Sequence, residues 1–361
     1  MNRADALVLH DSFAFKGGGE RLAEILCRGL RLDLAFGDYS EQSFDLKTLP
    51  GRCIDLKAKS GIPGWRTLKR FWAFGARTRF LKNYETVIYS GQNSVLAVYN
   101  HPSGKNIYYC NTPPRSVYDL KDFHLATLPK GQTPVHNAYN FIFRPWYEAA
   151  VDRMDVIVAN SKNIQKRIKA FLNKDSQVVH PPCETEKFRW MGQEDYYLST
   201  ARLTPLKRVD TIIEAFLQMP DRRLILASSG PEYERFQALA EGKTNISFAG
   251  AVDDERLQQL MGHAIATVYI PREEDFGISP VESMAAGKPV LGVAEGGLLE
   301  TVVHGETGIL IPPNPSVEDV IHGIRELGSA RAKEMRASCQ QRAGLFSKQV
   351  FLEKMKALIE E

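Results

Sequence analysis

The sequence lacks the features that would place the chain across a membrane or in an oxidising compartment. Its 361 residues contain no run of about 18 apolar residues, which excludes a membrane-spanning helix. The first residues, MNRADALVLHD, have neither the apolar core nor the cleavage site of a signal peptide and indicate a strand instead. The five cysteines lie far apart and form no C-x-x-C pair, which predicts neither a disulfide framework nor a zinc site. We therefore expect a cytoplasmic protein.

Several ligand-binding signatures are also absent. No strand is followed by G-x-G-x-x-G with an acid about 20 residues later, which disfavours a nicotinamide-dependent dehydrogenase. No G-K-[ST] follows the glycines of residues 17–19, which disfavours an ATP-binding P-loop. No recognised RNA-binding or DNA-binding module is present, and we expect no nucleic-acid partner.

The charge that is present is unevenly distributed. Residues 1–190 carry 28 Lys and Arg against 18 Asp and Glu, a net charge of +10; the remainder carries 18 against 25, a net charge of −7, and the two sum to the overall +3. A basic first half indicates an anionic partner, such as lipid headgroups or a phosphorylated substrate. Two solvated faces of different composition would produce the same asymmetry.

Short apolar runs rich in Val, Ile and Tyr alternate with amphipathic stretches along the chain. The candidate strands are residues 6–10, 86–90, 106–110, 155–160, 196–200, 223–228, 246–250, 266–270, 289–293 and 308–311. The candidate helices are residues 19–30, 162–172, 207–219, 231–241, 253–263 and 316–328. This alternation predicts an α/β fold with parallel sheets covered on both faces, and the number of strands favours two Rossmann-like domains.

The Pro-Pro step at residues 181–182 marks the expected join between domains, because proline stiffens a connection. We expect domains at residues 1–180 and 181–345, and a C-terminal helix at 346–361 with an apolar stripe of Phe351, Met355 and Leu358.

Ligands of open parallel sheets bind beyond the C-terminal ends of the strands. Two loops that follow predicted strands contain suitable residues: one is rich in glycine, and the other carries cations. After the first strand, Gly17, Gly18 and Gly19 permit positive φ and close approach to a ligand, although a flexible turn would look the same. After residues 196–200, Thr204 and Pro205 predict a helix start that puts Lys207 and Arg208 in the first turn, where cations oppose the helix dipole and a bound anion would reverse the balance. Arg202, on the loop just after the strand, could reach the same anion. A solvated basic turn is the alternative.

The third junction, EEDFGISPVESMAAGKPV at residues 273–290, carries two carboxylates. Ser279, Pro280 and Glu282 match a capping box, which would give Glu282 a structural role. Glu274 has no such explanation. It lies on a loop beside Gly277, where it could accept hydrogen bonds from sugar hydroxyls while nearby backbone N–H groups face a phosphate.

This segment resembles the E-x7-E motif of family 4 of the retaining GT-B glycosyltransferases, in the form E-x-F-G-x-x-x-x-E-[AS]-M-A-x-G-x-P-V. ARLTPLKRVDTIIEAF, ASSGPE and EGGLLETVVHGETGILIPP resemble further elements of that family, in order, over residues of about 196–313. GGGER and YYCNTPPRSVYDL in the first half match more loosely. The resemblance implies two Rossmann-like domains with parallel sheets facing across a cleft, and a final helix that returns to the N-terminal domain.

The resemblance also implies a chemistry. Arg202 and Lys207 would neutralise the diphosphate leaving group of a nucleotide diphosphate sugar, and Glu274 would hold sugar hydroxyls. The anomeric configuration would be retained. The sequence has no D-x-D motif, so the reaction would need no metal, and no cofactor is expected.

Further donor-binding roles follow in the same way. The N–H groups of Phe276, Gly277 and Ile278 would support the donor, and Glu282 would contact the ribose. The loop of Gly17, Gly18 and Gly19 would close over the diphosphate from the other domain.

The forms EEDFGI, LKRVD and NTPPRSVYDL resemble bacterial mannosyltransferases that use GDP-mannose to build O-antigen or exopolysaccharide on lipid-linked acceptors. Those enzymes usually carry a histidine where this chain has Asn111, which can donate a hydrogen bond but cannot titrate. Arg115 would contact a phosphate of acceptor or donor, or form a surface ion pair. A UDP-sugar donor, and a GT-B sugar-nucleotide epimerase or hydrolase, are the alternatives.

Residues 60–83 bear on the acceptor. In a helix, Trp65, Leu68, Trp72 and Ala76 form one stripe with arginines alongside, which suits peripheral contact with an anionic membrane, such as the cytoplasmic face of the inner membrane. A core helix with snorkelling arginines is the alternative.

Overall fold

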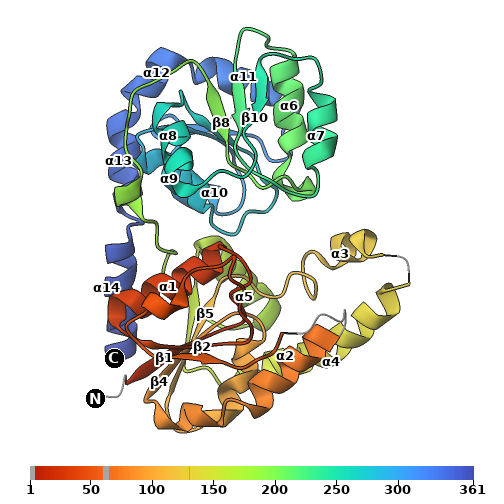
Figure 1. Ribbon diagram of the computed structural model, residues 1–361, viewed down its shortest axis with the longest axis vertical. Helices are drawn as coiled ribbons and strands as arrows, with labels where there is room; N and C mark the ends of the chain where they lie inside the picture. The colour runs from red at the N-terminus through yellow and green to blue at the C-terminus, as the bar shows by residue number, and fades with distance from the viewer. Residues whose placement is uncertain (1–4, 60–64, 130) are drawn as a thin grey trace. The chain divides into compact units, whose positions relative to one another are not determined.

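The computed structural model describes residues 5–59, 65–129 and 131–361, and for residues 65–67 the backbone only. The chain divides into two compact units, each with its own sheet (Figure 1). Unit 1 comprises Met1–His180 and Phe351–Glu361, and unit 2 comprises Pro181–Val350.

Unit 1 is built on a seven-stranded parallel sheet in the order β3-β2-β1-β4-β5-β6-β7. Along β1, Leu7 and Leu9 enter one apolar cluster, whereas Ala6 and Val8 enter another, as the two-residue period of a strand requires. The sheet is therefore covered on both faces. The strands are β1 (Ala6–His10), β2 (Asp33–Phe36), β3 (Cys53–Asp55), β4 (Thr86–Ser90), β5 (Lys105–Cys110), β6 (Val156–Ala159) and β7 (Gln177–Val178).

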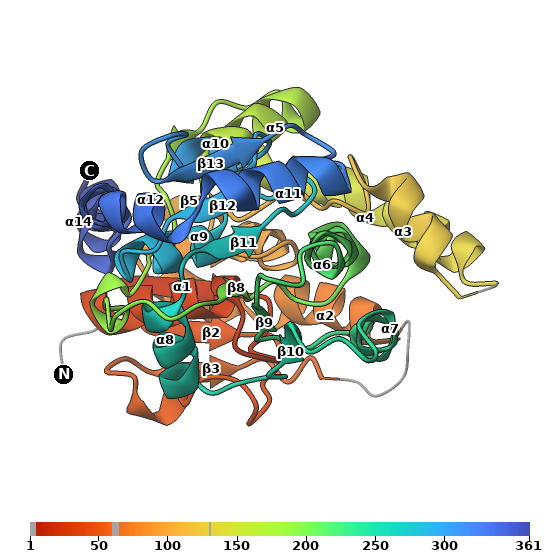
Figure 2. The same cartoon turned by 90° about the horizontal axis from the view of Figure 1, so that it is seen from above.

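Helices of unit 1 pack on the two faces. One face is covered by α1 (Gly18–Leu30) and α14 (Lys348–Glu360), and Phe351 of α14 meets Tyr109 edge-on at a ring distance of 6.0 Å. The other face is covered by α2 (Trp65–Ala76), α4 (Thr133–Val151) and α5 (Lys162–Leu172). The remaining helix, α3 (Lys121–Thr127), buries none of its residues, and with the start of α4 it extends away from the sheet of this unit (Figure 1 and Figure 2).

Unit 2 has a six-stranded parallel sheet in the order β10-β9-β8-β11-β12-β13. The strands are β8 (Tyr197–Ser199), β9 (Leu224–Leu226), β10 (Ile246–Phe248), β11 (Thr267–Tyr269), β12 (Val290–Val293) and β13 (Gly308–Ile311). The helices are α6 (Val209–Leu217), α7 (Tyr233–Leu239), α8 (Asp254–His263), α9 (Ile278–Ala285), α10 (Leu298–Thr301), α11 (Val317–Glu326), α12 (Ser329–Glu334) and α13 (Arg336–Gly344). Strand order reverses between β8 and β11 here, and between β1 and β4 in unit 1.

The predicted α/β class with two Rossmann-like parallel sheets is confirmed. All ten predicted strands exist, but β2, β3 and β7 were missed. The 19-residue α4 was missed as well. It holds a proline, Pro145, in its interior, where proline normally interrupts a helix.

Candidate functional site

Three side chains meet where the strand order of unit 2 reverses. Lys207 lies on the loop after β8, Tyr269 is the last residue of β11, and Glu274 lies on the loop that follows. The ammonium of Lys207 donates to Glu274 Oε2 at 2.5 Å and to the Tyr269 hydroxyl at 3.0 Å. The Tyr269 hydroxyl in turn donates to Glu274 Oε2 at 3.0 Å. This is the position at which open parallel sheets bind their ligands.

The electrostatics of these groups favour a charged pair beside a neutral phenol. Burial works against the ammonium form of Lys207, but Tyr269 and Glu274 outweigh it and raise the pKa of Lys207 above its usual value. Burial, and then the Glu274 carboxylate, raise the pKa of the Tyr269 phenol. At neutral pH the site therefore holds an ammonium, a carboxylate and a protonated hydroxyl. Tyr269 was not singled out from the sequence, because it reads as an ordinary apolar strand residue.

Arg202 lies on the same loop as Lys207, directly after β8. Its side chain is exposed and makes no hydrogen bond or ion pair with any residue that the structure describes. The two predicted cations thus differ: Lys207 is held within a polar cluster, whereas the guanidinium of Arg202 is available to an anion.

The prediction that Lys207 and Arg208 occupy the first turn of a helix is wrong. A short 3₁₀ turn, Pro205–Lys207, ends at Arg208, whose φ is 50°, and α6 starts only at Val209. The guanidinium of Arg208 donates to Glu295 at 2.8 Å and to Asn314 at 2.6 Å. Arg208 therefore links three loops of unit 2, and protein carboxylates pair with both Lys207 and Arg208.

The predicted capping box at Ser279 and Glu282 is wrong. Helix α9 starts at Ile278, and its N-cap is Gly277, whose φ of 91° turns the chain into the helix before Ser279 is reached. No side chain caps this helix. Glu282 is buried within α9, so the structural explanation given for it from the sequence does not hold. Gly287, with a φ of 71°, follows the end of the helix.

Two further glycines fix the loop that carries Glu274. The backbone N–H of Gly297 donates to the Glu274 carbonyl at 2.8 Å. A Cβ on Gly296 would lie 2.5 Å from that carbonyl oxygen, and one on Gly297 would lie 2.3 Å from Phe276 Cα. Only glycine fits at such distances, so this Gly-Gly pair holds the turn of residues 274–277 against the loop after β12. In the sequence analysis, these glycines had no role beyond the family resemblance.

In unit 1, the three glycines stand at the start of α1, with Gly17 as its N-cap. The expectation that they use positive φ is wrong, since Gly17 has a φ of −96° and none of the three is in the left-handed region. The expected close approach is not required at Gly19 either, since a Cβ there would meet its neighbours at ordinary van der Waals distance. A Cβ at this position would lie 3.5 Å from the ring of His10 and 3.7 Å from the Asn111 amide.

A row of polar side chains follows the strand ends beside this turn. Ser90 Oγ lies 3.3 Å from His10 Nδ1 and accepts from the Asn111 amide at 3.4 Å. The amide of Asn160 donates to the Asn111 carbonyl at 2.7 Å. Burial lowers the pKa of His10, which favours a neutral ring. Apart from Asn111, the sequence did not identify these residues, because single polar residues at strand ends form no motif.

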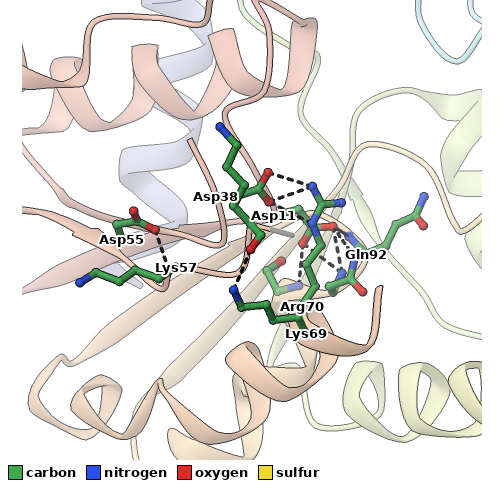
Figure 3. A network of polar contacts seen from close by, with 10 residues as sticks. Asp11, Asp38, Asp55, Lys57, Lys69, Arg70 and Gln92 are labelled. Carbon is green, nitrogen blue, oxygen red and sulfur yellow. Dashed lines mark hydrogen bonds and ion pairs between the residues drawn. The ribbon is translucent and has the colours of Figure 1, made fainter. Parts of the chain in front are cut away.

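Asp11 and Asp38 anchor the loops next to this row (Figure 3). The Asp11 carboxylate accepts from the backbone N–H groups of residues 92–94 at 2.7–3.0 Å, and Asp38 pairs with Arg70 at 2.8 Å. Arg115 pairs with Asp119 at 3.0 Å. This ion pair is the alternative that the sequence left open for Arg115.

The segment 60–83 only partly falls within the described structure. Residues 60–64 and the side chains of Trp65 and Arg66 lie outside the described residues. On α2, Leu68 and Trp72 are 57% and 53% exposed, so the predicted stripe faces outward instead of joining the core. The guanidinium of Arg77 lies 4.4 Å from the centre of the Trp72 ring.

Helix α4 also carries exposed apolar side chains. Phe141 is 83% exposed and Trp146 is 51% exposed, and Trp146 packs edge-on against Phe71 of α2 at 6.0 Å. Residues 56–83, which include α2, carry eight Lys and Arg and no Asp or Glu. We call Leu68, Trp72, Phe141 and Trp146 the α2–α4 surface.

Among the described residues, no group of three or more His, Cys, Asp and Glu side chains is placed to hold a metal ion. No helix in that part of the chain is long and apolar enough to cross a membrane.

Comparison with known proteins gives a family match within the second unit. Residues 182–345 match the family described as glycosyl transferases group 1. Arg202, Lys207, Tyr269, Glu274 and the start of α9 all fall inside the matched residues, whereas the glycine turn and the α2–α4 surface fall outside them.

Curated relatives resemble parts of the chain. The alpha-1,3/1,6-mannosyltransferase ALG2 of Dictyostelium discoideum is 34% identical over 122 residues, which is 33% of this chain and 29% of the relative. The D-rhamnosyltransferase WbpZ of Pseudomonas aeruginosa is 29% identical over 191 residues, 48% of this chain and 50% of the relative. The chain thus spans half or less of the length of both relatives.

The fold resembles solved structures over nearly the whole chain. The Anabaena protein HepE, solved in complex with UDP and glucose, superposes with a TM-score of 0.78 at 16% identity and covers 99% of this chain and 100% of its own. This likeness establishes the GT-B fold class.

Proposed function

We propose that the protein is a retaining, metal-independent glycosyltransferase that moves a hexose from a nucleotide diphosphate sugar to a lipid-linked or oligosaccharide acceptor in surface polysaccharide synthesis. The observation that carries the proposal is the cluster of Lys207, Tyr269 and Glu274 at the strand-order reversal of unit 2, within the residues that match the group 1 family, with the exposed Arg202 on the same loop.

The charges of this cluster suit the chemistry of transfer. When the anomeric C–O bond breaks, negative charge develops on the departing diphosphate, and preorganised cations aimed there lower the barrier. Among described residues, the Lys207 ammonium bonds Tyr269 and Glu274, which leaves its third N–H for a phosphate oxygen. Arg202 offers a planar fork to the same diphosphate. The Glu274 carboxylate accepts hydrogen bonds from hydroxyls of the transferred sugar.

The start of α9 supplies a second anion-binding element in this proposal. Backbone N–H groups of Phe276, Gly277 and Ile278 stand at the start of α9, whose N-cap residue is Gly277. Glu282 of the same helix contacts the ribose. In unit 1, the turn of residues 17–19 takes the diphosphate, and Asn111 and Arg115 contact the sugar or the acceptor.

GDP-mannose is the donor that we favour. The similarity to a mannosyltransferase over 122 residues supports mannose, whereas the fold neighbour solved with UDP and glucose supports a UDP-sugar as the alternative donor. Thermal stabilisation by GDP, UDP and their sugars separates the two, because a ligand at 100 times its Kd stabilises a protein by about 2.7 kcal/mol. Stabilisation by UDP and none by GDP would overturn the mannose assignment.

A turnover assay tests the reaction itself. We expect release of the nucleoside diphosphate from the preferred donor to depend on an added saccharide acceptor and to persist in EDTA. Donor conversion that is equally fast without any acceptor would indicate an epimerase or hydrolase instead.

Membrane contact on the cytoplasmic face of the inner membrane completes the proposal. The exposed aromatic side chains of the α2–α4 surface and the eight cations of residues 56–83 together suit the interface of an anionic bilayer. We expect the protein to float with vesicles that contain anionic lipid, and to lose this binding in high salt.

Two variants sharpen the membrane test. The double change Trp72→Ser and Phe141→Ser should weaken vesicle binding at least about tenfold, because full burial of one such side chain contributes roughly 1.5–3 kcal/mol and about 1.4 kcal/mol is a factor of ten. Leu299→Ser removes a similarly exposed apolar residue from unit 2 and should leave binding unchanged. Equal binding by both variants, or none by the wild-type chain, would contradict this part of the proposal.

A further inference from the structure

Tyr269 is the one member of the unit 2 cluster that carries no charge. It is 7% exposed, and its hydroxyl accepts from Lys207 and donates to Glu274, each at 3.0 Å. Lys207 and Glu274 also bond each other, so the three groups form a closed ring of hydrogen bonds. The Lys207 ammonium further lies 5.3 Å from the centre of the Tyr269 ring.

We propose that Tyr269 is a positioning residue, which holds the Lys207 ammonium and the Glu274 carboxylate in the arrangement that sugar transfer requires. This inference rests on the proposed function. A lysine ends a flexible four-carbon stem, and a single partner would leave its ammonium free to rotate about that contact. A second acceptor on a rigid ring fixes two of its three N–H directions and thereby sets the third.

The raised pKa of Tyr269 argues against a role as a proton acceptor. Burial and the Glu274 carboxylate keep the phenol protonated at neutral pH. A protonated hydroxyl can serve both neighbours at once, as donor to the carboxylate and acceptor from the ammonium. Tyr269 therefore acts through Lys207 and Glu274 and not on the sugar itself.

The hydroxyl can be removed without disturbing the packing, because Tyr269→Phe keeps the ring. We expect kcat to fall about tenfold and the KM for the donor to change by less than about threefold, since the change removes the hydroxyl's hydrogen bonds to both charged groups. Tyr196→Phe is the matched control. Its hydroxyl is bonded to the Leu260 carbonyl at 2.7 Å, away from the cluster, so its loss should lower stability and leave kcat unchanged.

A double-mutant cycle that measures nucleotide affinity distinguishes a positioning role of Tyr269 from a packing role. The free nucleoside diphosphate carries the charge of the leaving group, so Tyr269→Phe should raise the Kd for GDP or UDP, whichever binds, by about threefold. In a Lys207→Met background the same change should have no effect, because the group that Tyr269 positions is gone. Equal effects in both backgrounds would show that Tyr269 only packs, and would overturn the inference.

The wild-type measurements keep the two proposals distinguishable. If the wild-type chain transfers sugar and Tyr269→Phe has an unchanged kcat, the inference is wrong and the proposed function stands. If the wild-type chain transfers no sugar from any donor, the proposed function is wrong. In that case, only the Kd values for GDP and UDP in the two backgrounds test whether Tyr269 positions Lys207 toward a diphosphate.

Discussion

The two units place different kinds of polar groups at the same topological position. Where the strand order of unit 2 reverses, an ammonium and a carboxylate lie 2.5 Å apart within a closed ring of hydrogen bonds. At the matching position of unit 1, the row of His10, Ser90 and Asn111 is joined through neutral hydrogen bonds. Charges held in advance suit a reaction that develops charge, whereas neutral donors and acceptors suit recognition of hydroxyl groups.

The two units also differ in net charge and in the apolar side chains that they expose. Unit 1 carries most of the excess positive charge and exposes the aromatic side chains of α2 and α4, whereas the second part of the chain is acidic overall. Under the proposed function, this difference predicts that unit 2 supplies most of the leaving-group chemistry and that unit 1 contacts the acceptor. The following variants test that division, from the largest expected effect to the smallest.

Glu274→Gln should be the most damaging change to activity. It keeps the shape of the side chain but removes the charge that pairs with Lys207, so we expect transfer to fall by about 10³-fold with the melting temperature nearly unchanged. Initial rates of nucleoside diphosphate release measure the effect. Glu273→Gln, one residue away on the same loop, is the control and should retain activity. Substantial transfer by Glu274→Gln would refute the role given to unit 2.

Arginines of the two units should differ in the same assay. Arg202→Ala should lower kcat/KM by about 10–100-fold, because an exposed guanidinium without a partner among the described residues is free to bind the diphosphate. Arg115→Ala in unit 1 should cost less, because Asp119 already pairs with that charge. A larger loss for Arg115→Ala would reverse the assignment and move phosphate recognition into unit 1.

Because the pKa of Lys288 is lowered in the folded chain, we expect the stability of unit 2 to depend on pH. Burial, with Arg336 and Lys333 nearby, lowers the pKa of Lys288 to about 7, and its ammonium lies 3.3 Å from the Trp190 ring centre. A lysine pKa that is lower in the folded state means that the unfolded chain binds more protons between pH 7 and the ordinary lysine pKa. The free energy of unfolding should therefore fall as the pH falls through this window, by at most about 1.4 kcal/mol per pH unit.

Urea unfolding of Lys288→Met checks this prediction. The methionine keeps most of the buried stem, and the slope between pH 7 and pH 10 should decrease relative to the wild-type chain. Lys333→Met removes an exposed lysine and should leave most of the slope in place. An unchanged slope in Lys288→Met would show that Lys288 does not titrate in this range.

Much of unit 2 could be predicted from the sequence, because its site residues lie on loops that follow readable strands. Lys207 and Glu274 were both chosen correctly as neighbours of strand ends, and the structure brings them into contact. Their direct pairing was not foreseen. Sequence patterns locate a residue on a helix, strand or loop. They do not show which side chains meet across a separation of 67 residues.

Other errors have local physical causes. The capping box failed because Gly277 adopts a left-handed conformation that starts α9 two residues early, and a sequence pattern does not report φ. Arg208 was expected at a helix start, but Glu295 and Asn314 draw its side chain across to other loops. Short edge strands such as β3 were missed because they are too brief to show a period.

By itself the sequence determined the alternation of strands and helices, the two parallel sheets and the loops on which the cations and carboxylates lie, since all of these follow from local patterns of apolar residues, glycine and proline. Only the tertiary structure decided that Tyr269 joins Lys207 to Glu274, that Gly296 and Gly297 hold the Glu274 loop, and that the stripe on α2 faces outward beside α4. These features depend on contacts between residues far apart in the chain, and such contacts exist only after the sheet has placed its strand ends side by side.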